Sequence, residues 1–235
     1  LLEAAQDVTF TLVDEVSELS YAAHAAKADA IVIRTQPMSA ATIALAPNLK
    51  IVSRHGVGYD AVDVSALNAR KIPLAIVGDV NSGSVAEHAM MLILAASHRL
   101  LRADQSIRTG NWGWRNRLEA SEVAGKRLLI VGYGRIGRNL ARMALAFGME
   151  VVAHDPYLEK AGWLEGPVRP APDLKAALAG ADVVSLHVPK PEKPVLGMEE
   201  LAMLKKGAII INTARGGLVD EIALAEALKS GQVGA

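Results

Sequence analysis

The sequence KRLLIVGYGRIG at residues 126–137 decides the fold of the second half of this chain. An apolar run at residues 128–131 leads directly into G-x-G-x-x-G, and apolar residues at three- and four-residue steps then predict a helix. We expect Gly132 to allow a tight turn, Gly134 to let a pyrophosphate approach the backbone, and Gly137 to let the helix pack closely on the strand. The helix start would offer its N–H groups and the positive end of its dipole to the phosphates.

A glycine pattern of this kind is a weak signal by itself, because most glycine-rich turns bind nothing. Here a second apolar run at residues 149–153 precedes Asp155, which lies 155 − 137 = 18 residues past Gly137. This is close to the spacing expected of an acid that binds the adenosine ribose. A carboxylate there accepts from both ribose hydroxyls and repels a 2′-phosphate, so the sequence predicts NAD rather than NADP as the cofactor. The alternative interpretation makes Asp155 a turn residue before Pro156.

The composition is that of a globular protein without charge bias. Of 235 residues, 51% are hydrophobic, and 25 Lys and Arg residues balance 25 Asp and Glu residues, which argues against nucleic acid or an anionic membrane as a partner. The chain has no cysteine, which excludes disulfides and thiol catalysis and fits a cytoplasmic protein. The longest apolar stretch, residues 89–96, is too short to span a membrane. The six histidines form no spaced cluster with acids, so we expect no metal site.

Strands and helices are predicted to alternate along the chain, which indicates an α/β protein with parallel sheets. In the first half we expect strands at residues 8–13, 30–34, 49–53 and 74–77, with residues 1–6 ending an earlier helix. The second series begins at residue 126. We therefore predict two doubly wound parallel-sheet domains, each incomplete at its chain end. These are a flavodoxin-like substrate domain at residues 1–84 and a Rossmann NAD-binding domain at residues 85–235.

A long helix is predicted to join the two series. Ser84 and Glu87 have the spacing of a capping box, and the apolar residues at 85–101 run nearly without interruption. A helix this apolar is expected to be buried on several sides, between domains or at a subunit interface. We therefore predict a homodimer.

Two loops of the first half follow predicted strands, and ligands bind at the carboxyl ends of strands in an open parallel sheet. Arg34 follows one strand and can bind a carboxylate or phosphate through two N–H groups. Arg54 opens the other loop, in which Gly56 and Gly58 can turn backbone N–H groups toward an anion. For both loops a purely structural role is equally open.

Two loops of the second half are in the equivalent position. Residues 187–189, His-Val-Pro, follow a buried strand, and the proline can pack on a flat ring. Arg215 comes directly after the apolar strand predicted at residues 208–212 and is the best candidate for an arginine that faces ligand. Its alternative is a helix cap or salt bridge. No histidine stands out as a general base backed by a carboxylate.

Taken together, the motifs resemble those of the D-isomer-specific 2-hydroxyacid dehydrogenases, from about residue 28 to the end. The resemblance rests on RHGVGYDAVD (54–63), NSGSVAEH (81–88), GKRLLIVGYGRIG (125–137), AFGMEVVAHDPY (146–157), ADVVSLHVP (181–189) and KKGAIIINTARGGLVDEIALAEALKSGQVGA (205–235). It implies an NAD-dependent oxidoreductase that transfers hydride between the nicotinamide and C2 of a D-2-hydroxy acid.

The resemblance also assigns roles to matching residues. The backbone N–H groups of Arg135 and Ile136 would hold the pyrophosphate, and Arg215 would be the catalytic arginine that binds the substrate carboxylate and carbonyl oxygen. Thr213 and Ala214 would line the nicotinamide side. The whole implied cofactor set is Gly132, Gly134, Arg135, Ile136, Gly137, Asp155, His187, Val188, Pro189, Thr213, Ala214 and Arg215.

For the substrate, the resemblance implies that Gly56, Val57 and Gly58 bind the carboxylate through backbone N–H groups. Arg34 and Arg54 would hold a distal phosphate, which makes 3-phosphoglycerate a candidate substrate.

The chain departs from the family pattern in three places, one of which is Asp60-Ala61, where the family often has Asp-Asn. The family's catalytic glutamate and histidine are expected beyond Ala235, so residues 1–235 should bind NAD weakly and not turn over. Residues 189–197 form a shorter segment than usual, with Lys193 and Pro194 where a threonine often contacts NAD. The alternative function is a non-catalytic NAD-binding module, like the corepressor relatives within this superfamily.

Overall fold

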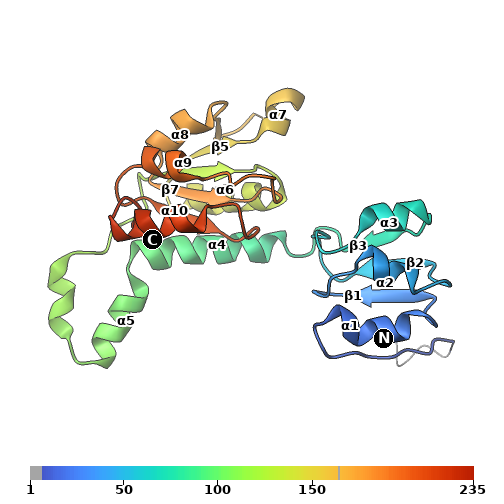
Figure 1. Cartoon of the computed structure of the whole chain (residues 1–235). Helices are drawn as coiled ribbons and strands as arrows, with labels where there is room; N and C mark the ends of the chain where they lie inside the picture. The colour runs from blue at the N-terminus through green and yellow to red at the C-terminus, as the bar shows by residue number, and fades with distance from the viewer. Residues whose placement is uncertain (1–6, 164) are drawn as a thin grey trace. The chain divides into compact units, whose positions relative to one another are not determined.

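The structure, a computed structural model, describes residues 7–163 and 165–235, and they form two compact units that divide between Val80 and Asn81 (Figure 1). Both units are α/β with parallel sheets, which confirms the predicted fold class. The predicted end of a helix at residues 1–6 lies outside the described residues. None of the helices within the described ranges is long and apolar enough to cross a membrane.

The first unit holds a three-stranded parallel sheet in the order β1-β2-β3. Its strands are β1 (Ala30–Ile33), β2 (Ile51–Arg54) and β3 (Leu74–Ile76), and its helices are α1 (Glu18–Ala25), α2 (Ala40–Ala44) and α3 (Val64–Ala69). Each helix has an N-cap residue whose side chain accepts a hydrogen bond from a backbone N–H of the first turn. These residues are Ser17, Ser39 and Asp63. Ile33, Met38, Ile43, Val52 and Leu67 lie at the centre of its core.

The prediction of a strand at residues 8–13 is wrong. These residues have no regular structure, and Val8, Phe10 and Leu12 are 46, 43 and 76% exposed. Their alternation is typical of a strand, but no strand of the described small sheet pairs with them.

The second unit begins with helices and continues as a five-stranded parallel sheet. The helical segments are α4 (Ser82–Ser97), α5 (Leu100–Arg108) and the 3-10 helix η2 (Trp112–Arg117). The sheet series is β4 (Arg127–Val131), α6 (Arg135–Ala146), β5 (Glu150–His154), α7 (Pro156–Ala161), β6 (Arg169–Pro170), α8 (Leu174–Gly180), β7 (Val183–Leu186), α9 (Met198–Met203), β8 (Ile209–Asn212) and α10 (Glu221–Lys229).

The strand order is β6-β5-β4-β7-β8, so the chain starts in the middle, runs outward to β6 and returns to the other side of β4. This is the Rossmann arrangement, whose switch point lies between β4 and β7. Residues of β4 alternate between two cores. Leu128 and Ile130 pack in a cluster with α4 and α6, and Leu129 and Val131 pack in a cluster with α8, α9 and α10.

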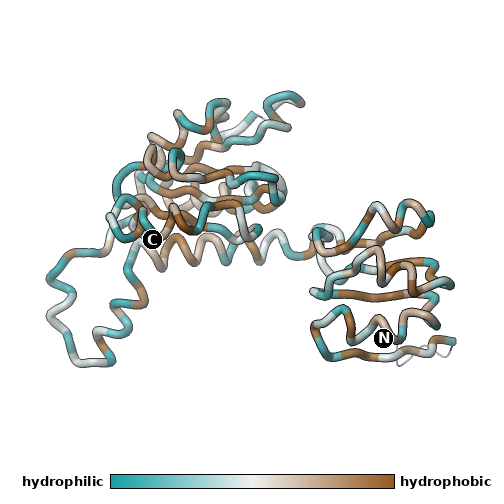
Figure 2. Tube along the Cα trace, viewed as in Figure 1, coloured by the Kyte–Doolittle hydropathy of each residue, from teal (hydrophilic) through white to brown (hydrophobic). Residues whose placement is uncertain are grey.

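Burial on both faces explains why residues 128–131 of the central strand are all apolar. In Figure 2 the strands of this sheet are largely brown, the colour of hydrophobic residues.

The long helix is shorter than predicted and starts differently. It begins at Ser82, and its described start receives no side-chain hydrogen bond at Asn81, so the predicted capping box at Ser84 is wrong. It ends at Ser97 because Arg99 adopts a left-handed backbone with φ 52°. The Arg99 Nη1 donates to the carbonyl oxygen of Gly234 at 3.0 Å, which holds this break against the end of the chain.

The apolar run that predicted an interface is explained within the unit. Ala86, Ala89, Met90 and Ile93 of α4 are buried in the cluster that includes α6. The segment at residues 100–118 carries several exposed apolar side chains, among them Leu101, which is 83% exposed, and Leu118, which is 86% exposed.

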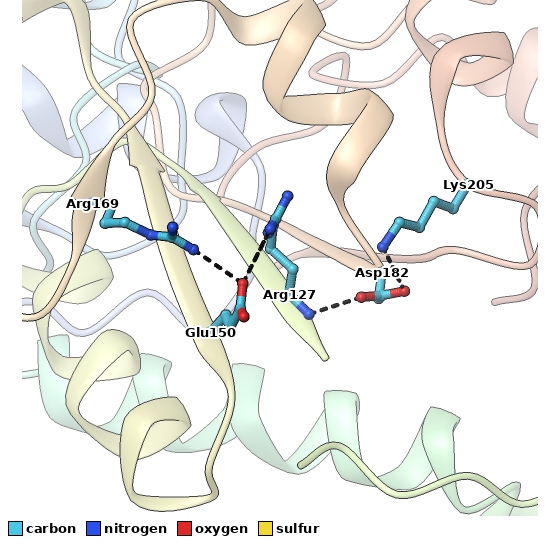
Figure 3. A network of polar contacts seen from close by, with 5 residues as sticks. All are labelled: Arg127, Glu150, Arg169, Asp182 and Lys205. Carbon is cyan, nitrogen blue, oxygen red and sulfur yellow. Dashed lines mark hydrogen bonds and ion pairs between the residues drawn. The ribbon is translucent and has the colours of Figure 1, made fainter. Parts of the chain in front are cut away.

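A polar network joins the amino ends of the strands (Figure 3). Glu150, at the start of β5, accepts from Arg127 at 3.1 Å and from Arg169 at 3.0 Å. Asp182, just before β7, accepts from the backbone N–H of Arg127 at 2.8 Å and from Lys205 at 3.1 Å. Burial alone would raise the pKa of Asp182, but these bonds hold that pKa below its usual value. The network joins the strands at their amino ends. Ligand is expected at the other end of the sheet, at the carboxyl ends of the strands.

Candidate dinucleotide site

The glycine turn lies at the switch point of the five-stranded sheet. Gly132 follows β4 with φ +94°. A Cβ built there would lie 2.7 Å from the carbonyl oxygen of His187 and 2.8 Å from Val188 Cγ1. The turn therefore packs against the backbone of the loop that follows β7, and only glycine fits both the dihedral and the contact.

The start of α6 is open. Gly134 is exposed, and a Cβ built on it would meet nothing within 4 Å. No side chain of the described residues caps this helix, and the N–H groups of Arg135 and Ile136 lie in its first turn, where they have no acceptor within the helix. Uncapped N–H groups beside an open glycine can bind an anion.

Gly137 lies inside α6 and faces the turn. A Cβ there would lie 2.4 Å from the carbonyl oxygen of Gly132 and 3.0 Å from Ile130 Cγ2. The predicted close packing of helix and strand at Gly137 is thus confirmed.

The carboxylate of Asp155 accepts hydrogen bonds from three backbone N–H groups, which the sequence analysis did not predict. Its Oδ1 accepts from the backbone N–H of Tyr157 at 2.9 Å and of Leu158 at 3.2 Å, which makes it the N-cap of α7, with Pro156 in the first turn. Its Oδ2 accepts from the N–H of Tyr133 at 2.8 Å. Asp155 therefore has the structural role that the alternative interpretation gave it, next to Pro156. The bond to Tyr133 also holds its carboxylate beside the glycine turn. A carboxylate has about four acceptor positions, and these three bonds leave about one of them, on Oδ2, for a ribose hydroxyl.

Among the residues that the structure describes, two buried side-chain atoms without a hydrogen-bond partner lie at the carboxyl ends of β7 and β8. They are His187 Nδ1 and Thr213 Oγ1. The strands pair Leu186 with Asn212, so His187 and Thr213 are the next residues on neighbouring strands. Burial lowers the pKa of His187 to about 4, so its ring is neutral at physiological pH. Unpaired buried polar atoms are rare in native proteins and indicate a place that a ligand or water completes.

Two polar residues at these strand ends were missed by the sequence analysis. Ser185 is fully buried, and its Oγ lies 2.9 Å from Nε2 of His187. The available signal was a serine inside an apolar strand, two residues before a histidine and thus on the same side of the strand.

Asn212 is the second. Its Nδ2 donates to the carbonyl oxygen of Arg215 at 2.8 Å, and its Oδ1 accepts from the N–H of Ala214 at 3.1 Å. These two bonds close the loop that carries Arg215. The Arg215 Nη1 donates to the carbonyl oxygen of Ala214 at 2.9 Å.

The remaining predicted residues are placed as follows. Val188 is half-buried and Pro189 exposed after β7, and Ala214 is half-buried after β8. Within the first unit, Arg34 follows β1 and is exposed, whereas Arg54 ends β2 and is half-buried. Ile33 pairs with Arg54, so both arginines lie at the carboxyl edge of the small sheet.

The loop after β2 is partly covered by its own arginine. Arg54 Nη1 donates to the carbonyl oxygen of His55 at 2.5 Å, and a Cβ built on Gly56 would lie 2.3 Å from the same nitrogen. Val57 and Gly58 follow, both half-buried. Across residues 7–163 and 165–235, no group of three His, Asp or Glu side chains is arranged to hold a metal ion.

The geometry fits a dinucleotide, and comparison with known proteins also indicates a dinucleotide-binding unit. The NAD binding domain of the D-isomer specific 2-hydroxyacid dehydrogenases matches residues 90–235. D-3-phosphoglycerate dehydrogenase of Mycobacterium leprae is 45% identical over 212 residues, which cover 88% of this chain and 39% of that protein. Hydroxypyruvate reductase of Thermotoga maritima is 38% identical over 208 residues, which cover 87% of this chain and 66% of that protein.

Among solved structures, D-lactate dehydrogenase of Aquifex aeolicus complexed with NAD and lactic acid is similar, with a TM-score of 0.81 and 29% identity. The alignment covers 91% of this chain and 65% of that one. The chain thus spans about two fifths of the length of its phosphoglycerate dehydrogenase relatives. The family match confirms the prediction of NAD as the cofactor.

Proposed function

Because this chain belongs to the D-isomer-specific 2-hydroxyacid dehydrogenase family, we propose that the whole protein is an NAD-dependent oxidoreductase that acts on a D-2-hydroxy acid. The observation that carries the proposal is the open, uncapped start of α6 at the switch point of the sheet, next to two unpaired buried polar atoms. When bound, NAD supplies the acceptor or donor of the hydride.

The predicted cofactor residues of the second unit contact different parts of NAD in this proposal. The N–H groups of Arg135 and Ile136 hold the pyrophosphate, Gly134 leaves room for it, and Asp155 binds the adenosine ribose. Residues 187–189 flank the adenosine, and Thr213 and Ala214 line the nicotinamide side.

Arg215 is the proposed catalytic arginine. Its guanidinium binds the substrate carboxylate and the oxygen at C2, which orients C2 and stabilises negative charge on that oxygen. The two Asn212 bonds that close its loop fix the backbone from which the guanidinium extends. Residues 81–235 would thus be the cofactor unit, and the first unit would hold the substrate through the loop at residues 56–58.

The proposed substrate is 3-phosphoglycerate. It is supported by the phosphoglycerate dehydrogenase relatives and by Arg34 and Arg54, which lie together at one edge of the small sheet. In the whole protein, Arg34→Ala is expected to lower kcat/KM for 3-phosphoglycerate about tenfold, as for one charge-assisted hydrogen bond, and to leave glycerate unaffected. Lys50→Ala is the matched control, because it removes a positive charge just before β2, at the other edge of the sheet.

The activity test measures NADH absorbance in the whole protein with 3-phosphoglycerate, glycerate and lactate. Turnover with one of these acids supports the proposal. NAD binding without turnover of any of them would favour the regulatory alternative, and an equal loss for all acids in Arg34→Ala would refute the phosphate role.

A homodimer also belongs to this proposal. Its support is the exposed apolar surface at residues 100–118, which includes Leu101, Ile107, Trp112 and Leu118. Leu101→Asp is expected to convert a dimer into a monomer in light scattering, whereas Leu19→Asp, equally exposed on α1, should not. A dimer that survives Leu101→Asp would exclude this surface. A cytoplasmic location stays a prediction.

A further inference from the structure

Ser185 is a hydroxyl in a place where hydroxyls are costly. It lies on the central part of β7, paired with Ile130 of β4 on one side and Ile211 of β8 on the other, and it is fully buried. A buried hydroxyl lowers stability unless it is hydrogen-bonded. Within the described residues, the one partner found for it is Nε2 of His187, at 2.9 Å.

The direction of this contact sets which nitrogen of His187 carries the proton, because a hydroxyl can either donate to Nε2 or accept from it. The hydrogen of the Ser185 hydroxyl needs an acceptor, and Nε2 is the acceptor within reach. When Nε2 accepts from that hydroxyl it carries no hydrogen, and the proton of the neutral ring is then on Nδ1. The low pKa of His187 keeps the ring neutral at physiological pH.

The Nδ1–H group produced in this way has no acceptor in the described part of the chain. Nδ1 is buried and unpaired, as is Thr213 Oγ1 on the neighbouring strand end. Both belong to loops at the switch point, where the backbone of His187 packs against Gly132. With the proton on Nδ1, the site contains one unused donor and one unused hydroxyl just after two neighbouring strands.

We propose that Ser185 is a positioning residue of the dinucleotide site: it fixes His187 as the Nδ1–H tautomer and keeps that N–H available as a donor to an oxygen or ring nitrogen of the bound dinucleotide. The inference rests on the proposed function, because it takes the ligand to be NAD. Both unpaired atoms are closed to solvent in the free chain, so binding must move the loop at residues 187–189 to reach Nδ1.

The test combines ¹⁵N NMR of the six histidines with NAD titration by calorimetry. His187→Gln identifies the His187 signals. In the wild-type chain, Nδ1 is expected to be protonated and to shift when NAD is added. Ser185→Ala should increase the population of the Nε2–H tautomer and raise the Kd for NAD about threefold to tenfold, the value of one hydrogen bond.

Two further variants separate positioning from simple destabilisation. Ser185→Thr keeps the hydroxyl and should restore both the tautomer and the affinity. Val184→Ala removes packing from the opposite face of the same strand, so it should lower the melting temperature without changing the tautomer or the Kd.

The proposal is overturned if Ser185→Ala keeps the Nδ1–H tautomer, or if the tautomer changes while the Kd does not. If the wild-type chain fails to bind NAD at all, the dinucleotide function fails. The free-chain spectra would then still show whether Ser185 determines the His187 tautomer.

Discussion

Substitution of the two glycines at positions 134 and 137 by alanine separates folding from ligand binding. In Gly137→Ala the new methyl group would lie 2.4 Å from the carbonyl oxygen of Gly132, a backbone atom that cannot swing away. Helix α6 must therefore move off the strand. Overpacking of this kind costs about 1–3 kcal/mol, which corresponds to a fall in melting temperature of roughly 2–12 °C for a unit of this size.

Gly134→Ala is the matched control and should behave in the opposite way. Its methyl group meets nothing within 4 Å, and the backbone at φ −76° suits any residue. Alanine is a poorer N-cap than glycine, which lowers stability, but it also makes the unfolded chain less flexible, which raises stability. The free energy of unfolding should therefore change by less than about 1 kcal/mol. The methyl group occupies the space proposed for the pyrophosphate, so NAD affinity should fall at least about tenfold, or about 1.4 kcal/mol.

Thermal denaturation of the free chain measures the first effect, and calorimetric titration with NAD measures the second. The reasoning is refuted if Gly134→Ala binds NAD as the wild type does, or if Gly137→Ala is as stable as the wild type.

Three other predictions concern single side chains. Asp155→Ala removes the acceptor of three N–H groups, so the free energy of unfolding should fall by about 1–3 kcal/mol in denaturant titrations and the NAD to NADP affinity ratio should fall as well. His187 has a folded-state pKa of about 4, below its unfolded value, so its contribution to stability is present above pH 6.5 and is lost as the pH falls toward 4; the pH dependence of unfolding should flatten over this range in His187→Gln. Asp182→Ala should cost more stability than Glu150→Ala, about 1–3 against less than about 1 kcal/mol, because the partly buried N–H of Arg127 depends on Asp182 whereas Glu150 forms exposed ion pairs. Equal losses in chemical denaturation would contradict that order.

The central sheet of the second unit could be predicted because its signals are local. Leu128 to Val131 are buried on both faces, and Gly132 and Gly137 have backbone or packing demands that only glycine meets. The positions of Asp155 and Arg215 at strand ends follow from the same alternation of elements.

The failures have long-range causes. The long helix ends at Ser97 partly because Arg99 bonds Gly234, a residue 135 positions away, which no local pattern reveals. Residues 8–13 have strand-like alternation, but a strand needs a partner that sequence alone does not supply. The two-residue strand β6 is too short to leave a pattern. The contact of Ser185 with His187, in contrast, joins residues two positions apart and had a local signal.

The most direct test of the account is a crystal structure of residues 1–235 with NAD. We predict the pyrophosphate oxygens within hydrogen-bonding distance of the backbone nitrogens of Arg135 and Ile136, with the adenosine ribose on Asp155. A dinucleotide bound elsewhere, or side chains filling the space over Gly134 at saturating NAD, would contradict the central claim.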